Sequence, residues 1–463
     1  MSSQTTQPPV PESGPAHELL SAALRYTRDA EVFWAREDAV TAGIVGNREP
    51  SQTHAAEAVG LRVIHGGHIG HAVHHGSIQR VENAALLGQA TRNTAQGPPA
   101  PPTFWKERAT GLPIPTWDDD VASLDEKDLR RMARQAAARL RDMLGKDVPT
   151  QVAVRRLIRR TVLLTRAAER LVERTILSFQ AQVGPLPDGG SRFTESWISG
   201  RIPDDPMASL GNIIWRASLG TSIATCPSSP NRAVFGPRAV GVLLHWLANT
   251  LTGTRLLDGC SRWNSGLVDN AQIVDERITL FDNPLRPWAP TSAPYDAEGL
   301  PRDRHALVER GVLRTLLLDL STAWQLGLEP RGTASRGFDT PPTPAPSFLE
   351  LVNGPEGFED LLSGCEGGIY VDTLDEGAEP AADGQFEAMA GNAFRIRNGR
   401  PSGWLPGVVI TANLHELLNE QVLAIGGDRL GGPNVCCGSI AFRDVEFHGP
   451  SSTPEETTAG PRS

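Results

Sequence analysis

The sequence is poor in cysteine and lacks a long apolar run. Its 463 residues include five cysteines and no CxxC pair, which is typical of a reducing compartment rather than of a disulfide framework. No apolar run reaches the roughly 18 residues that a membrane-spanning helix needs. The opening segment, MSSQTTQPPVPESGPA, has neither a basic region nor an apolar core. We therefore expect no secretion signal, a cytoplasmic location and no membrane partner.

An excess of positive charge is also missing. Lysine and arginine total 44 against 54 aspartates and glutamates, a net charge of -10, so a general nucleic-acid surface is not expected. The stretch 151–183 is an exception, because it carries arginines at 155, 156, 159, 160, 166, 170 and 174. Glu169 and Glu173 interrupt it. We interpret these arginines as a solvated or partner-facing edge.

The order of local patterns predicts an α+β protein. Apolar residues at helical spacing predict helices over 17–27, 81–91 and 124–144, the last with Ser123 as its N-cap. Alternation predicts strands over the segments 30–35, 40–45, 57–64 and 69–75. From about residue 225 the chain is richer in Gly and Pro, and its predicted strands are short and separated by turns, as in ERITLFD (276–282).

These patterns divide the chain into two structured parts and two tails. Residues 16–224 are predicted to form an N-terminal α+β domain of hairpins and helices. Residues 225–448 are predicted to form a mostly β domain, barrel-like or with a curved sheet, and a few helices. Residues 1–15 and 449–463 are polar or Pro-rich, and we expect them to be disordered.

The stretch 232–253, RAVFGPRAVGVLLHWLANTLTG, predicts a short strand, a turn and a helix. Pro237 falls in the first helical turn, where its missing N–H costs least, and Gly253 is expected to end the helix. One face of the helix is leucine-rich. The other face carries Gly241, His245, Ala248 and Thr252. Such a face lets a neighbour approach the backbone, and His245 is the ionisable side chain near its middle.

This strand, turn and helix resemble the metal helix of the TldD/PmbA peptidases. In TldD-type members of that family the helix carries HExxxH, in which two imidazoles bind zinc and the glutamate serves as general base. Here His245 occupies the first position, but Trp246 replaces the glutamate and Thr250 replaces the second histidine. The chain therefore resembles the PmbA branch, also called TldE, whose members lack the complete motif and pair with a TldD-type subunit.

Further family-like motifs follow one another in the right order from residue 17 to residue 448. The first is a "G-x-R-V-x-x-x-G-x-x-G" segment, met by Gly60, Arg62, Val63, Gly67 and Gly70. Others lie in 295–327, in the hairpin-like segment 384–402 and in the strand and helix of 408–428. The resemblance thus extends over most of the chain.

Three further groups are candidates for binding. The strands predicted over 57–64 and 69–75 are joined by HGGH, which is a hairpin signal. This hairpin holds five histidines, His65, His68, His71, His74 and His75. Alternation along the strand places His71 and His75 on one face and His74 on the other. We therefore interpret the hairpin as a solvent-exposed surface, with a weak metal site as the alternative. Asp296 and Glu298 lie in a Gly/Pro turn that is ordinarily solvated, and with His245 they are our candidates for contacting substrate or partner.

The late cysteines are the third group. TldD-type members complete their zinc site with a late cysteine in a "C-G-K-x-G-Q" context, which is absent around Cys436 and Cys437. His245 and one thiol would supply two ligands where catalytic zinc has three and a water. We interpret the two thiols as buried and structural, and we assign no catalytic or metal-binding residue to this chain.

The resemblance implies a non-catalytic subunit of a heteromeric, TldD-type zinc metallopeptidase that trims extended, unstructured peptides or peptide-like biosynthetic precursors. It implies no cofactor in this chain, zinc in the TldD-type partner, and a sheet edge along which a peptide can add. Two alternatives stay open: a stand-alone metal-dependent amide hydrolase with unusual ligands, and a binding or scaffold protein that has lost its peptidase partner.

Overall fold

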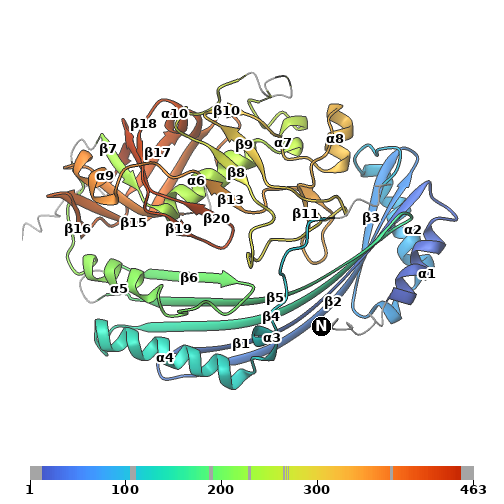
Figure 1. Ribbon diagram of the computed structural model, residues 1–463, viewed down its shortest axis with the longest axis horizontal. Helices are drawn as coiled ribbons and strands as arrows, with labels where there is room; N and C mark the ends of the chain where they lie inside the picture. The colour runs from blue at the N-terminus through green and yellow to red at the C-terminus, as the bar shows by residue number, and fades with distance from the viewer. Residues whose placement is uncertain are drawn as a thin grey trace, which may run out of the picture.

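The computed structural model describes residues 13–104, 111–186, 191–227, 231–263, 266, 268, 271–375 and 379–449. A long curved sheet from the N-terminal half lies below a C-terminal half of shorter strands (Figure 1). Helices and strands occur along the whole chain, and the strand pairs are antiparallel except for β7 with β14 and β13 with β20, which confirms the α+β prediction. Most of the two tails predicted to be disordered lies outside the described residues, but residues 13–15 belong to the first helix. No helix in the described ranges has the length and apolar character to cross a membrane.

The N-terminal sheet has six antiparallel strands in the order β3-β2-β1-β4-β5-β6. The strands are β1 (Asp29–Val45), β2 (Ser51–His65), β3 (His68–His75), β4 (Thr150–Thr165), β5 (Glu169–Val183) and β6 (Phe193–Ser199). Side chains alternate between the two faces. Ala30, Val32 and Trp34 of β1 pack under helices on the outer face, whereas Phe33 and Ala35 face the C-terminal half.

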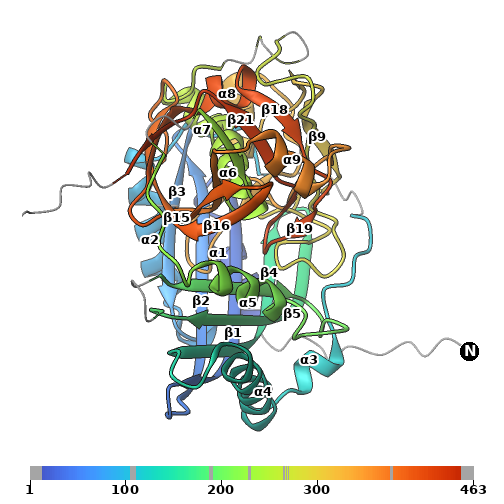
Figure 2. The same cartoon turned by 90° about the vertical axis from the view of Figure 1, so that its left-hand side faces the viewer.

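Helices cover the outer face of this sheet at both ends. They are α1 (Ser13–Ala23) and α2 (Asn83–Asn93) at one end, and α3 (Asp119–Ser123) and α4 (Glu126–Leu144) at the other. Leu129, Ala133 and Leu140 of α4 are buried against β1 and β4. Figure 2 shows the resulting order, with α4 below, the strands above it and the C-terminal half on top. The inner face of the sheet is therefore left for contacts with the C-terminal half.

Two local predictions in this half were wrong. The strands predicted over 30–35 and 40–45 are a single strand, β1. Helix α4 does not use Ser123 as its N-cap, because Ser123 ends α3; Asp125 caps it instead, in a reciprocal capping box with Asp128. The hairpin predicted at 57–75 is confirmed as β2 and β3.

Glycines of the "G-x-R-V" motif allow close approach in this hairpin. Gly67 has a φ of +81° in the turn, a conformation that favours glycine. A Cβ on Gly70 would lie 1.9 Å from the carbonyl oxygen of Ala90. The motif therefore sets the turn and brings α2 onto β3.

The C-terminal half contains two larger sheets with helix α6 (Pro237–Thr250) between them. One sheet has the order β18-β21-β7-β14-β15-β17-β22, with β16 on β15, and the other β10-β9-β8-β13-β20-β19. The strands of the first sheet are β7 (Arg232–Phe235), β14 (Ile369–Leu374), β15 (Gln385–Arg397), β16 (Arg400–Trp404), β17 (Val409–Asn413), β18 (Val422–Ile425), β21 (Ile440–Arg443) and β22 (Glu446–His448). Those of the second are β8 (Leu280–Asp282), β9 (His305–Glu309), β10 (Val312–Leu313), β13 (Leu349–Leu351), β19 (Leu430–Gly431) and β20 (Val435–Cys437).

Short elements complete the half. They are the pair β11 (Ala334–Ser335) and β12 (Thr343–Pro344), and the helices α7 (Gly253–Leu257), α8 (Leu320–Leu326), α9 (Phe358–Gly364) and α10 (Leu414–Asn419). Helix α5 (Leu210–Leu219) belongs to the N-terminal half and lies beside β6 and α4. The strand predicted over 276–282 is confirmed only for its last three residues. The helix predicted to run to Gly253 ends at Thr250, and Gly253 begins α7.

Candidate functional site

Helix α6 is positioned by its leucine face. Val240, Leu243, Leu244 and Leu247 are fully buried in the core of the C-terminal half, and strand β7 leads into the helix through Gly236 and Pro237. On the opposite face, a Cβ on Gly241 would lie 3.0 Å from Val435 of β20. The small-residue face therefore allows β20 to approach the helix backbone, as the sequence predicted for a neighbour of this face.

A cavity of about 640 Å³ lies along this face. It is bounded by Thr194, Glu195 and Ser196 of β6, by the segment 430–435 and by α6, which contributes Arg238, Gly241, Val242, His245 and Asn249. The volume lies within the range of small-molecule sites in proteins. His245 thus lies at a cavity that joins an edge strand of the N-terminal sheet to the C-terminal half.

His245 is half-buried and oriented by its own helix. Its Nδ1 lies 2.8 Å from the carbonyl oxygen of Gly241, one turn earlier. A carbonyl oxygen only accepts, so Nδ1 carries the hydrogen, and Nε2 of the neutral ring is left as an acceptor or ligand atom.

The other two positions of the metal motif are occupied by residues with structural contacts. The Trp246 ring is buried and packs 5.0 Å from Phe386. Thr250 donates to the carbonyl oxygen of Leu247 at 2.7 Å and accepts from Trp263 Nε1 at 3.2 Å. Among the described residues, no three His, Cys, Asp or Glu side chains converge as metal ligands. The residues around His245 therefore do not fit a catalytic zinc ion.

Two arginines and two carboxylates form a network at one wall of the cavity. Arg216 is fully buried and contacts Glu195 Oε2 at 2.5 Å and Asp372 Oδ2 at 3.0 Å. Arg238 contacts the same two carboxylates, at 2.5 Å and 3.1 Å. Burial raises the pKa of Glu195, while the two arginines act to lower it. Sequence reasoning missed this network, although Arg216 within the apolar run of α5 was a signal for it.

The late cysteines are buried, as predicted, and Cys437 lies at the start of α6. Cys437 Sγ donates to the carbonyl oxygen of Pro237 at 3.1 Å, and Cys436 Sγ accepts from Arg429 Nε at 2.7 Å. Both are buried. Burial raises the pKa of Cys437 far above its ordinary value, so this thiol stays protonated at neutral pH.

Asp296 and Glu298 are buried and do not form a solvated turn. The Asp296 carboxylate accepts hydrogen bonds from the backbone N–H groups of Glu298, Leu300 and Ala334. Glu298 accepts from Arg62 Nη2 at 2.8 Å and from the Leu320 N–H at 2.7 Å. Burial raises the pKa of Glu298 to about 7. Neither residue lines the cavity of His245; Asp296 lines a second cavity.

The histidine-rich hairpin does not gather its imidazoles into one site. His71 lies opposite Arg62 in the register of β2 and β3, and burial, Arg62 and Arg336 lower its pKa to about 4. His75 instead lies 3.7 Å from Asp339. Three arginines of 151–183 also differ from the prediction, because Arg159, Arg170 and Arg174 line the second cavity inside the chain, whereas Arg155 and Arg166 are exposed as predicted.

Comparison with known proteins identifies relatives of this chain, chiefly of its C-terminal half. Residues 229–449 match the family model described as the PmbA/TldA metallopeptidase C-terminal domain. A metalloprotease of Methanothermobacter thermautotrophicus is 32% identical over 207 residues, 44% of this chain and 45% of that protein. A metalloprotease of Archaeoglobus fulgidus is 27% identical over 211 residues, 45% and 48% of the two chains. The chain thus spans about half the length of the curated relatives it matches.

The fold as a whole also has solved counterparts. The crystal structure of TldE from Thermococcus kodakarensis is similar with a TM-score of 0.81 at 18% identity, over 94% of this chain and 100% of that chain. The C-terminal half of the chain therefore matches a metallopeptidase domain of the PmbA/TldA type, and the fold of the whole chain is similar to that of TldE.

Proposed function

We propose that this chain is the non-catalytic, TldE-like subunit of a heteromeric metallopeptidase. In this proposal a TldD-type partner holds the zinc, and the complex cleaves or trims extended peptides. The observation that carries the proposal is helix α6. Of its three motif positions, only His245 presents a possible ligand atom, while Trp246 packs against Phe386 and Thr250 is bonded to Leu247 and Trp263.

The cavity beside α6 is the proposed contact with the peptide. His245 and Asn249 offer polar groups there, and Val242 offers apolar surface. Addition of a peptide along β6 is restricted at one point, because the Thr194 carbonyl already accepts from Arg216 at 2.8 Å. Asp296 and Glu298 contribute by holding the turn at 295–300 through their backbone and Arg62 contacts.

The test is co-expression with a TldD-type subunit, followed by pull-down, zinc analysis and a peptide-cleavage assay. The isolated chain is assayed in parallel. We expect zinc and cleavage only in the complex, with zinc equimolar to the partner. His245→Ala should weaken cleavage without removing zinc. The exposed hairpin residue His68 provides the matched control, since His68→Ala should change neither.

Two outcomes would contradict the proposal. If the isolated chain binds metal and cleaves, and loses both with His245→Ala, it is a stand-alone hydrolase with unusual ligands. If it forms a stable homo-oligomer and binds no TldD-type subunit, it is a binding or scaffold protein.

A further inference from the structure

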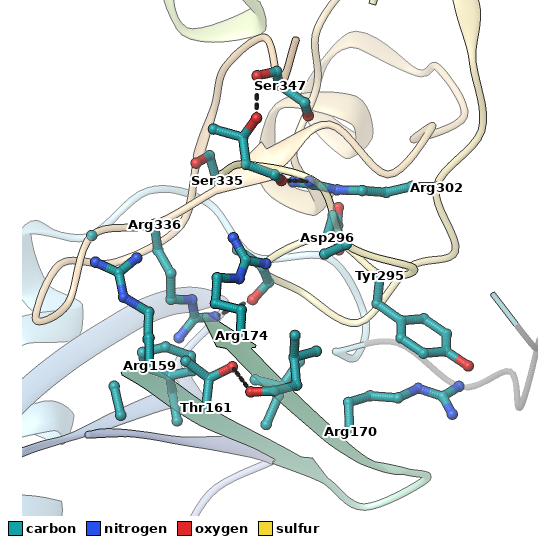
Figure 3. A pocket seen from close by; sticks show the side chains of 18 of the residues that line it. Arg159, Thr161, Arg170, Arg174, Tyr295, Asp296, Arg302, Ser335, Arg336 and Ser347 are labelled. Carbon is teal, nitrogen blue, oxygen red and sulfur yellow. Dashed lines mark hydrogen bonds between the residues drawn. The ribbon is translucent and has the colours of Figure 1, made fainter. Parts of the chain in front are cut away.

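A second cavity, of about 190 Å³, lies between the two halves of the chain (Figure 3). Its floor is the inner face of β1, β4 and β5, and its other walls come from the segments 290–302 and 335–347. An engineered cavity of roughly 150 Å³ binds benzene. The space is therefore large enough for a small organic molecule.

The lining of this cavity is cationic. Of the side chains that line it in the described part of the chain, only Asp296 is acidic, and three backbone N–H groups already hold its carboxylate. Five arginines line the same space: Arg159, Arg170, Arg174, Arg302 and Arg336. They come from both halves of the chain, so the cavity exists only where the halves meet.

Arg174 and Arg302 hydrogen-bond to backbone rather than to acids. Arg174 donates to the carbonyl oxygens of Pro290 and Ser292. Arg302 donates to those of Thr291 at 3.1 Å and Ala334 at 3.0 Å. Within the described ranges, no carboxylate lies at ion-pair distance from either guanidinium. Neither guanidinium therefore has an ion-pair partner among these residues, although the charges of Asp296 and Asp282 favour the protonated form of Arg302 from a longer distance.

The neighbouring charges repel one another. Burial, Arg159 and Arg302 lower the pKa of Arg174 to about 9, and burial lowers the pKa of Arg302. The Arg174 guanidinium remains protonated at neutral pH, since its pKa of about 9 is still above neutrality. A bound anion would favour these charged forms and offset their repulsion.

Buried polar atoms at the cavity also lack partners. Arg302 Nε, Arg336 Nε and Ser347 Oγ have no hydrogen-bond partner among the described residues. Arg302 and Ser347 are only 7% and 5% exposed. Buried donors are nearly always bonded, because an unmade hydrogen bond costs the desolvation of the group. Two independent features therefore meet at one cavity: donors without a hydrogen-bond partner, and two arginines, Arg174 and Arg302, without an ion pair among the described residues.

We propose that this cavity binds a small organic anion through a phosphate or carboxylate group. The oxygens of that group accept hydrogen bonds from Arg174, Arg302 and Ser347, and the planar guanidinium groups match both kinds of anion. Phe33 and Leu163 in the floor contact a short apolar body. The proposal is independent of zinc and of a partner subunit.

The experiment is isothermal titration calorimetry on the full chain, at constant ionic strength set with chloride. The probes are inorganic phosphate, succinate and a short peptide with a free C-terminal carboxylate, with the same peptide as its C-terminal amide. We expect a single saturable site for at least one anionic probe and none for the amide. If phosphate or succinate binds more tightly than the acid peptide, the ligand of this cavity is a free small molecule. If the acid peptide binds more tightly, the ligand is the C-terminal carboxylate of a peptide chain.

Three variants locate the binding. Arg174→Met should weaken the best probe by about tenfold or more, the size expected for a charged hydrogen bond. Ser347→Ala should weaken it several-fold and leave folding unchanged, because the hydroxyl has no hydrogen-bond partner in the described part of the chain. Arg139→Met on the exposed side of α4 is the control. The proposal is overturned if no anion saturates, or if Ser347→Ala and any folded Arg174→Met bind like the control.

Discussion

Arg62 lies at the centre of a buried group of charges. It contacts Glu31 at 3.3 Å and Glu298 at 2.8 Å, and Arg336 contacts Glu31 from the C-terminal half. All four side chains are almost fully buried. Burial and these positive neighbours are what keep the nearby His71 imidazole neutral, because a third cation would be repelled.

His71 should make the protein acid-sensitive. Its pKa is about 4 in the folded chain against an ordinary value of 6.5, so the unfolded chain binds more protons between these values. The contribution of His71 to stability is complete above pH 6.5 and is lost as pH falls toward 4. The free energy of unfolding of His71→Asn, from urea titrations, should therefore fall less than that of the unaltered chain across this window.

The exposed His68 is the control for this experiment. His68→Asn should follow the unaltered chain at every pH. A pH dependence that is the same in His71→Asn as in the unaltered chain would show that this imidazole titrates normally.

At the scale of elements, helix α4 shows how a cap decides where a helix begins. The Asp125 side chain accepts from the N–H groups of Lys127 at 2.8 Å and Asp128 at 2.9 Å, and Asp128 bonds back to the Asp125 N–H at 3.3 Å. Ser123 instead donates to Asp120 at the end of α3. Both residue types favour an N-cap position, so composition alone did not separate them.

Asp125→Ala should destabilise the protein by about 1 kcal/mol, the usual loss for a removed N-cap. Ser123→Ala, two residues away, should change the free energy of unfolding by less than about 0.5 kcal/mol, because that hydroxyl is exposed. Urea unfolding of the two variants provides the measurement. Equal effects would mean that Asp125 is not the cap.

Strand β1 shows why one element was predicted as two. Arg36, Glu37 and Asp38 interrupt its apolar alternation, and three consecutive charged residues taken alone are typical of a turn. In the sheet, Glu37 stands directly opposite Arg159 of β4 and pairs with it. Cross-strand partners of this kind are over 100 residues away along the chain, so local pattern does not contain them.

At the scale of the whole molecule, the sequence correctly predicted the α+β class, helix α6 and the burial of its leucine face. It did not reach the second cavity, because Arg174 and the carbonyl oxygen of Ser292 meet across 118 residues. Nor did it reach the Arg62 group, in which Glu298 is 236 residues from its partner. Local periodicity predicts which residues share a face, whereas these contacts depend on how the two halves meet.

The contacts between the halves predict that they unfold together. Arg62 to Glu298, Arg336 to Glu31 and Arg216 to Asp372 all cross the same boundary while buried. Native-state hydrogen exchange should therefore give amides of β1 and α6 the same free energy of opening. Arg62→Met removes the positive partner of the buried carboxylates, so the free energies of opening of β1 and of α6 should both fall, by about 3–5 kcal/mol. Separate values that respond separately would contradict this coupling.

The wall beside helix α6 is electrically neutral, because Arg216 and Arg238 balance Glu195 and Asp372. A balanced wall produces little long-range field, so it neither attracts nor repels a peptide on account of the peptide's own charge. Peptides of differing composition would then be accepted with similar affinity, and that affinity would depend little on salt. The cationic cavity between the halves is the opposite case, since ions in solution compete there directly. Taken together, the two proposals give one chain a surface that tolerates different peptide sequences and a cavity that selects for negative charge.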